Sequence, residues 1–221
     1  MKFFHVTHAL KIFAGSFLST IAVFAFADQP GRGLTNQFEV YYLKTIIDHH
    51  YSSLRITELA AGTEYDITSV ISSDDRVHPS PNFIATEPLT DSNEIKSISR
   101  KNNRIQREEI LLAQDVLRKL YGVKYEPRLT QKAQRNIQLL ETVQGAEFDI
   151  RFIEILSRHY YQVAVLSLNC LVAHDIAHRE LQRYCQNVLD SRINDIDHMR
   201  ELACTSYQRC DIQTQRPLPV F

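Results

Sequence analysis

Apolar residues recur every three or four positions in four long stretches of the chain, a period that predicts amphipathic α-helices. In the third stretch the apolar face runs through Phe148, Phe152, Ile155, His159, Val163, Leu166 and Cys170. The four predicted helices cover about residues 36–61, 95–121, 144–172 and 178–206. Four long helices, each with one apolar face, predict an all-α protein with the architecture of a four-helix bundle.

The segments between these helices carry residues that end helices. Residues 62–94 are rich in Ser, Asp and Pro and predict a long irregular loop. A tight turn is expected near His174, and residues 122–130, which contain a proline, are expected to form a linker. Residues 211–221 follow the last cysteine and predict an extended tail.

The two halves of the chain carry the same pattern of residues. His49 aligns with His159, and the residues around them match at the same offset of 110 positions. The match predicts two copies of one helical hairpin, at about residues 36–122 and 144–210, since two copies are too few for a solenoid. We therefore expect residues 28–210 to form one bundle from two repeated hairpins.

The first 27 residues have the composition of a secretory signal peptide. They contain lysines but no acidic residue, an apolar run from Ile12, and small residues at the expected cleavage site before Asp28. No later segment has an apolar run long enough to cross a bilayer, so we expect no stable membrane span after cleavage. The mature chain is expected to be periplasmic or secreted.

All four cysteines lie in the last third of the chain. In an exported protein, cysteines are expected to form disulfides rather than to act as catalytic thiols. The four candidates, which allow three pairings, are Cys170, Cys185, Cys204 and Cys210. Cys170 and Cys185 stand at similar distances from the expected turn, which favours a bond between them. Cys204 and Cys210 would then close the start of the tail. A zinc site is disfavoured because no CxxC spacing occurs.

The charge balance excludes one broad class of partner. The chain has 25 Lys and Arg against 26 Asp and Glu, so it lacks the basic excess that general nucleic-acid binding requires. No P-loop, GxGxxG, GxSxG or HExxH motif occurs in the chain. The sequence therefore favours a non-enzymatic protein.

Polar residues interrupt the apolar faces of all four helices. His49 and His159 lie within the faces of the first and third helices, with His50 at the edge, while Glu109 and Asp195 lie within those of the second and fourth. Counting the helical rise from the expected turn places His159 and Asp195 at similar heights, so these residues can meet in one layer. Imidazole and carboxylate groups together suit Zn, Mn, Fe or Cu.

The same residues also fit a buried polar layer without a metal. Arg192 lies near the centre of the fourth apolar face, where it would pair with Asp195 or Glu109 and repel a metal ion. His174 and His178 have the i, i+4 spacing of a metal clamp if they are helical. Capping of the fourth helix is the alternative for these two histidines.

Several short motifs in both copies resemble a known family. They are Gly145-Ala146-Glu147-Phe148, His159, Cys170-Leu171, His178-Arg179-Glu180-Leu181, Tyr184-Cys185, Asp195-Ile196-Asp197-His198-Met199 and Leu202-Ala203-Cys204 in the second copy, and His49-His50 and Glu109-Ile110 in the first. Over residues 36–210 the chain resembles the bacterial exported domain-of-unknown-function family number three hundred and five. The resemblance implies a ferritin-like four-helix bundle and, through the CopM-type periplasmic copper-binding members, copper or another transition metal. It offers His49, His50, His159 and Met199 as ligands.

The second copy departs from the family pattern. Its paired histidine is followed by Tyr160, and the usual glutamine is Gln106 in the first copy but Arg192 in the second. The usual methionine is Ala113 in the first copy and Met199 in the second. Because the mature chain has a single methionine, copper handling is implied by analogy alone.

Taken together, these patterns predict an exported protein that binds a metal ion or confers metal tolerance. The candidate ligands are His49, His50, Glu109, His159, Asp195 and Met199. The main alternative is a structural or protein-interaction module in which a buried layer of His, Glu, Asp and Arg holds no metal. A ferritin-like oxidase with altered ligands is the third alternative.

Overall fold

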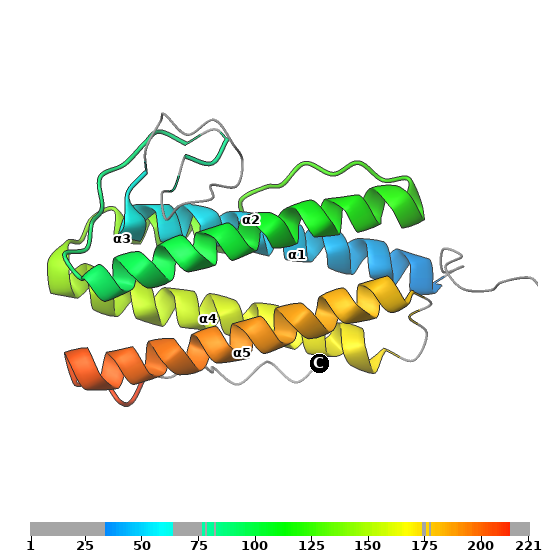
Figure 1. Ribbon diagram of the computed structural model, residues 1–221. Coiled ribbons are helices and arrows are strands. Elements are labelled where there is room, and N and C mark those ends of the chain that lie inside the picture. The colour runs from blue at the N-terminus through cyan, green and yellow to red at the C-terminus, as the bar shows by residue number, and fades with distance from the viewer. Residues whose placement is uncertain are drawn as a thin grey trace, which may run out of the picture.

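The computed structural model describes residues 34–63, 77, 79–81, 83–173, 176 and 178–212, and the expected signal peptide lies outside them. Within these ranges the chain forms helices and no strands (Figure 1). The helices are α1 (Leu34–Ala61), α2 (Asn93–Tyr121), α3 (Gln131–Leu140), α4 (Gly145–Val172) and α5 (Arg179–Tyr207). The predicted all-α fold is confirmed, and the four long helices begin and end close to their expected bounds.

The long helices pack as two pairs. α1 packs along α2 and α4 packs along α5, and the two pairs meet mainly through α1 and α4. Figure 1 shows one pair lying above the other, with all four helices roughly aligned. Each helix can therefore direct one face toward the centre of the bundle.

The short helix α3 was not predicted from the sequence. It begins after Thr130, whose side chain accepts a hydrogen bond from the backbone N–H of Ala133, and it packs against α1 and α4. Ala133, Ile137 and Leu140 are its buried residues, spaced so that they share one face. This helix covers an end of the α1 and α4 interface.

Two apolar clusters fill the core. One includes Ile56, Phe148 and Phe152 and contains Ile137 and Leu140 of α3. The other includes Tyr42 and Val188 and lies toward the opposite ends of the long helices. Burial of each large apolar side chain contributes roughly 1.5–3 kcal/mol to folding.

A buried carboxylate anchors the connection between α1 and α2. Glu58, on α1, accepts hydrogen bonds at Oε1 from Ser80 N at 2.8 Å and from Ser80 Oγ at 2.5 Å. Arg107 Nη2, on α2, lies 3.2 Å from the same oxygen, and Tyr51 donates a 2.6 Å hydrogen bond to the carbonyl of Pro81. The described part of this connection is thus fastened to both helices that it joins.

Both expected disulfides are present. Cys170 near the end of α4 is bonded to Cys185 in α5, and Cys204 in α5 is bonded to Cys210 in the loop that follows. The favoured pairing is confirmed, and two disulfides indicate an oxidising environment. None of the described helices combines the length and the apolar character needed to cross a membrane.

Candidate functional site

A layer of polar side chains separates the two apolar clusters. His50 from α1, Glu109 from α2, Tyr160 from α4, and Arg192 and Asp195 from α5 form its centre. His50 Nε2 and Arg192 Nη2 each lie 3.3 Å from Glu109 Oε2. Arg192 Nη1 lies 3.5 Å from Asp195 Oδ2. One guanidinium therefore bridges the two carboxylates that the sequence offered as metal ligands.

Arg192 is fully buried and has a second kind of partner. Its guanidinium carbon lies 4.5 Å from the centre of the Tyr160 ring, close enough for a cation–π interaction. Nη2 also donates a 3.0 Å hydrogen bond to Ser191 Oγ. The planar guanidinium suits this place because it can contact carboxylates along its edge and an aromatic ring with its face.

The other side of the layer is joined by neutral hydrogen bonds. Gln106 Nε2 donates to the Tyr160 hydroxyl, and Ser53 Oγ donates to Gln106 Oε1 at 2.5 Å. Gln106 and Arg192 occupy equivalent positions in the two copies, as do His50 and Tyr160. Tyr160 thus contacts the glutamine of the first copy with its hydroxyl and the arginine of the second with its ring.

Two equivalent histidines meet where the copies pack together. His159 Nε2 donates a 2.8 Å hydrogen bond to the carbonyl oxygen of His49, and their ring centres are 4.9 Å apart. The two histidines are 110 positions apart, the offset at which the two halves of the sequence match.

The structure reverses the expected burial of the adjacent histidines His49 and His50. His50, predicted at the edge of its apolar face, is completely buried, whereas His49, predicted at the centre, is partly exposed. The reason is that α1 packs against α2, α3 and α4, so its buried face is wider than a single stripe.

Two other candidate ligands lie elsewhere. Met199 is buried in the apolar cluster that contains Phe148, and its sulfur lies 3.8 Å from Ser157 Oγ. His178 precedes α5 and is fully buried, with Nδ1 3.5 Å from Glu39 Oε2. Its proposed metal-clamp partner, His174, lies outside the described residues.

The layer does not fit the metal that the family resemblance implies. Within the described ranges, no three His, Cys, Asp or Glu side chains gather closely enough to hold a metal ion. Arg192 already contacts both Glu109 and Asp195, and it would repel a second cation there. On the histidine side, His49 Nδ1 and His50 Nδ1 make no hydrogen bond, while His50 Nε2 faces Glu109.

Burial controls the charge state of the layer. Burial lowers the pKa of His49 to about 4 and places the pKa values of His50 and His159 well below 6.5, with Arg192 adding to the effect at His50. Burial also raises the pKa of Glu109 to about 7, against the opposing effect of Arg192. The pKa of Asp195 is raised for the same reason. At neutral pH the imidazoles are uncharged and Arg192 is the cation of the layer.

These pKa shifts predict a loss of stability in mild acid. Below pH 6.5 the unfolded chain binds protons at three imidazoles that the folded chain leaves neutral, so stability falls with pH. Glu109 acts in the opposite sense between about pH 7 and 4.5, because there the folded chain binds a proton that the unfolded chain does not. The three histidines outweigh Glu109 and Asp195, and we expect the free energy of unfolding to fall by about 3 kcal/mol from pH 7 to pH 5.

Urea unfolding at pH 7, 6 and 5 measures this dependence. Glu109→Gln removes one opposing group and should make the loss per pH unit steeper. His198→Gln removes a half-exposed histidine outside the layer and is the matched control. Stability that stays constant or rises from pH 7 to pH 5 would show that the imidazoles are not held neutral.

Comparison with known proteins adds no relative. The chain matches no family model, no curated protein and no solved structure.

Sequence reasoning missed three members of the layer. Tyr160, Gln106 and Ser53 were not among the candidate site residues, although the first two were noted as repeat positions. A signal was present in the repeat, because Tyr160 aligns with His50 and Gln106 with Arg192. Equivalent positions of the two copies thus carry different side chains in the layer.

Proposed function

We propose that the protein is an exported, non-enzymatic helical bundle that serves as a structural or protein-interaction module. In this proposal its buried polar layer takes its cation from Arg192 and binds no metal. The observation that carries the proposal is the position of the guanidinium, 3.3 Å from Glu109 and 3.5 Å from Asp195.

The layer has a physical role without a ligand. Sliding α5 by one turn along its partners would separate Arg192 from Glu109 and leave both charges in apolar surroundings. An uncompensated buried charge costs about 3–5 kcal/mol, which strongly disfavours such a shift. The layer therefore specifies the register in which the helices pack, as buried polar residues do in coiled coils.

Burial also supports a non-enzymatic function. Arg192, His50 and Tyr160 are fully buried and His159 is nearly so, and their main contacts are with one another and with neighbouring helices. A substrate would have to displace these contacts to reach a reactive atom. Export to the periplasm or beyond is supported by the two disulfides and by the expected signal peptide.

Elemental analysis of the purified protein tests the proposal. After expression with export in medium containing Cu, Zn, Mn and Fe, and dialysis without a chelator, we expect less than about 0.1 equivalent of each metal per chain. Near-stoichiometric metal that is lost in Glu109→Gln would contradict the proposal. A change at the exposed residue Glu108 serves as the matched control.

A soft metal ion on the histidine side is the second candidate function. It is supported by the Nδ1 atoms of His49 and His50, which make no hydrogen bond, and by the low pKa values that keep these rings in the neutral form that metals bind. Cu(I) titrated under anaerobic conditions separates the two candidates. Stoichiometric binding that survives in Glu109→Gln and disappears in a His49→Ala/His50→Ala variant would favour the metal.

A further inference from the structure

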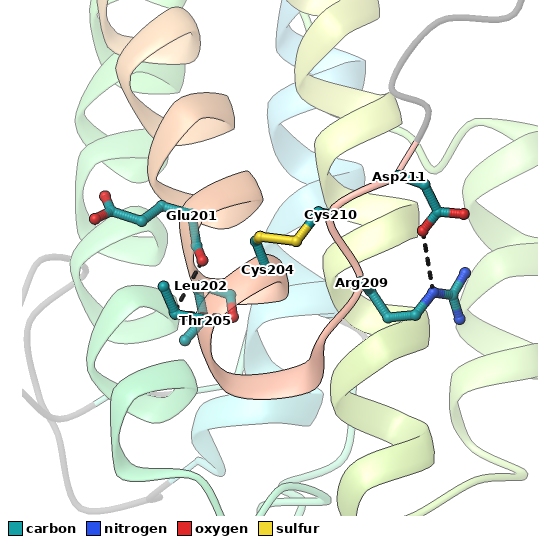
Figure 2. Close-up of a disulfide and its surroundings, with 7 residues drawn as sticks. All are labelled: Glu201, Leu202, Cys204, Thr205, Arg209, Cys210 and Asp211. Carbon is teal, nitrogen blue, oxygen red and sulfur yellow. Dashed lines mark hydrogen bonds and ion pairs between the residues drawn. A yellow bond between two sulfur atoms is a disulfide. The ribbon is translucent and has the colours of Figure 1, made fainter.

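The two disulfides differ in their access to solvent. Cys170 and Cys185 are completely buried between α4 and α5. Cys210 is exposed and Cys204 is half-buried. Figure 2 shows the Cys204–Cys210 bond joining the last turns of α5 to the loop that folds back beside them. Thiol–disulfide exchange requires direct attack on a sulfur atom, so access separates the two bonds chemically.

The exposed bond closes a short loop that returns the chain to α4. The backbone N–H of Arg209 donates a 2.9 Å hydrogen bond to the carbonyl of Ala203, and Arg209 Nη2 lies 3.2 Å from Glu154 Oε1 on α4. Ile212 is 7% exposed and belongs to the apolar cluster that contains Phe148. The bond therefore lies beside a segment, residues 208–212, that covers part of the core.

The same loop contains an unfavourable backbone conformation. Gln208 has a φ of 55°, and it is the only non-glycine residue in the described ranges with a positive φ. A side chain in this region of φ and ψ is strained and persists where surrounding contacts hold it. Apart from the disulfide, the segment is held by backbone hydrogen bonds to the Ala203 carbonyl, by buried Ile212 and by a partly exposed ion pair, which adds little.

We propose that Cys204–Cys210 is a reducible latch on the C-terminal segment. An external dithiol opens this bond while Cys170–Cys185 stays intact, and opening releases residues 208–212 from α4. The latch makes the cover over this end of the apolar core depend on the thiol environment, and it operates independently of the buried polar layer.

The exchange proceeds in two balanced steps. A thiolate of the dithiol attacks Cys210 Sγ, forming a mixed disulfide, and Cys204 leaves as a thiolate that takes up a proton. The second thiolate of the dithiol then attacks the dithiol sulfur that is bonded to Cys210. Cys210 leaves as a thiolate that takes up a proton. Two electrons pass to the protein, which gains two thiols, and the dithiol is oxidised to its disulfide.

Graded reduction of the full chain tests the order of opening. The oxidised protein is incubated with increasing dithiothreitol at neutral pH without denaturant, quenched with iodoacetamide and mapped by mass spectrometry. We expect Cys204 and Cys210 to be alkylated at least about tenfold faster than Cys170 and Cys185. Equal rates, or earlier opening of the buried bond, would overturn the proposal.

Hydrogen exchange tests the release itself. Selective reduction should increase amide exchange in residues 208–212 and leave the centres of α4 and α5 unchanged. A Cys204→Ser/Cys210→Ser variant should show the same increase without reductant, and Cys170→Ser/Cys185→Ser serves as the matched control with no increase there. Protection of residues 208–212 that persists after the exposed bond opens would show that the disulfide is not the latch.

Discussion

Arg192→Met lowers the free energy of unfolding by about 3–5 kcal/mol, the largest effect that we expect from any single substitution in the polar layer. The change preserves much of the side-chain volume but removes the cation that contacts Glu109 and Asp195. Two carboxylates then remain in a buried layer without a compensating charge. Chemical denaturation at pH 8 measures the loss, which should shrink at pH 6 because protonation neutralises Glu109, whose pKa is about 7.

Combined substitutions separate charge from packing. Adding Glu109→Gln and Asp195→Asn to Arg192→Met removes the uncompensated charges and should recover a large part of the lost stability. Arg183→Met, at an exposed position of α5, is the matched control and should change stability by less than about 0.5 kcal/mol. A triple variant no more stable than Arg192→Met would show that the guanidinium acts through packing alone.

Removing the buried disulfide has the second largest expected effect. Cys170→Ala/Cys185→Ala should lower the free energy of unfolding by about 3 kcal/mol, since the bond closes a loop with a sequence separation of 15 residues. The bond also ties the end of α4 to the first turns of α5. Guanidinium unfolding of the oxidised proteins measures the difference.

The second disulfide supplies an internal comparison. Cys204→Ala/Cys210→Ala removes a bond with a sequence separation of 6 residues and should cost about 2 kcal/mol. A larger loss from this pair than from Cys170 and Cys185 would contradict the view that the buried bond is the main covalent constraint on the bundle.

The sequence predicted the long helices well because each carries many turns of a consistent apolar pattern. It missed α3 because that helix has only 10 residues and follows a proline-containing linker. Its start was nevertheless marked by Thr130, and Ala133, Ile137 and Leu140 recur at helical spacing. Short helices depend on tertiary packing more than on their own pattern, so the contacts with α1 and α4 are decisive.

The polar layer was predicted in part. Helical rise and periodicity were enough to bring His159 and Asp195 toward one level. They did not determine which groups would be partners, because that depends on distances between helices. Arg192 was correctly expected to pair with the carboxylates, whereas its contact with Tyr160 was not foreseen.

Differences between the two copies explain much of the layer's chemistry. Where the first copy has Gln106 and His50, the second has Arg192 and Tyr160, and the last two stack on one another. Arg192 needs carboxylates as counter-charges, and the face of the Tyr160 ring attracts its cation. The two residues that depart from the repeat therefore contact each other in the folded chain.

The most direct test of the account is the thermal midpoint of the wild-type protein and of Arg192→Gln, each measured with Zn, Cu(II) or Mn and with a chelator. Arg192→Gln gives the second copy the residue of the first, Gln106, and leaves the carboxylates without their cation. We expect no metal-dependent shift in the wild-type protein, and a lower midpoint in the variant that rises when a divalent ion is added. A wild-type midpoint that rises with stoichiometric metal and falls with the chelator would contradict the claim that Arg192 completes the layer.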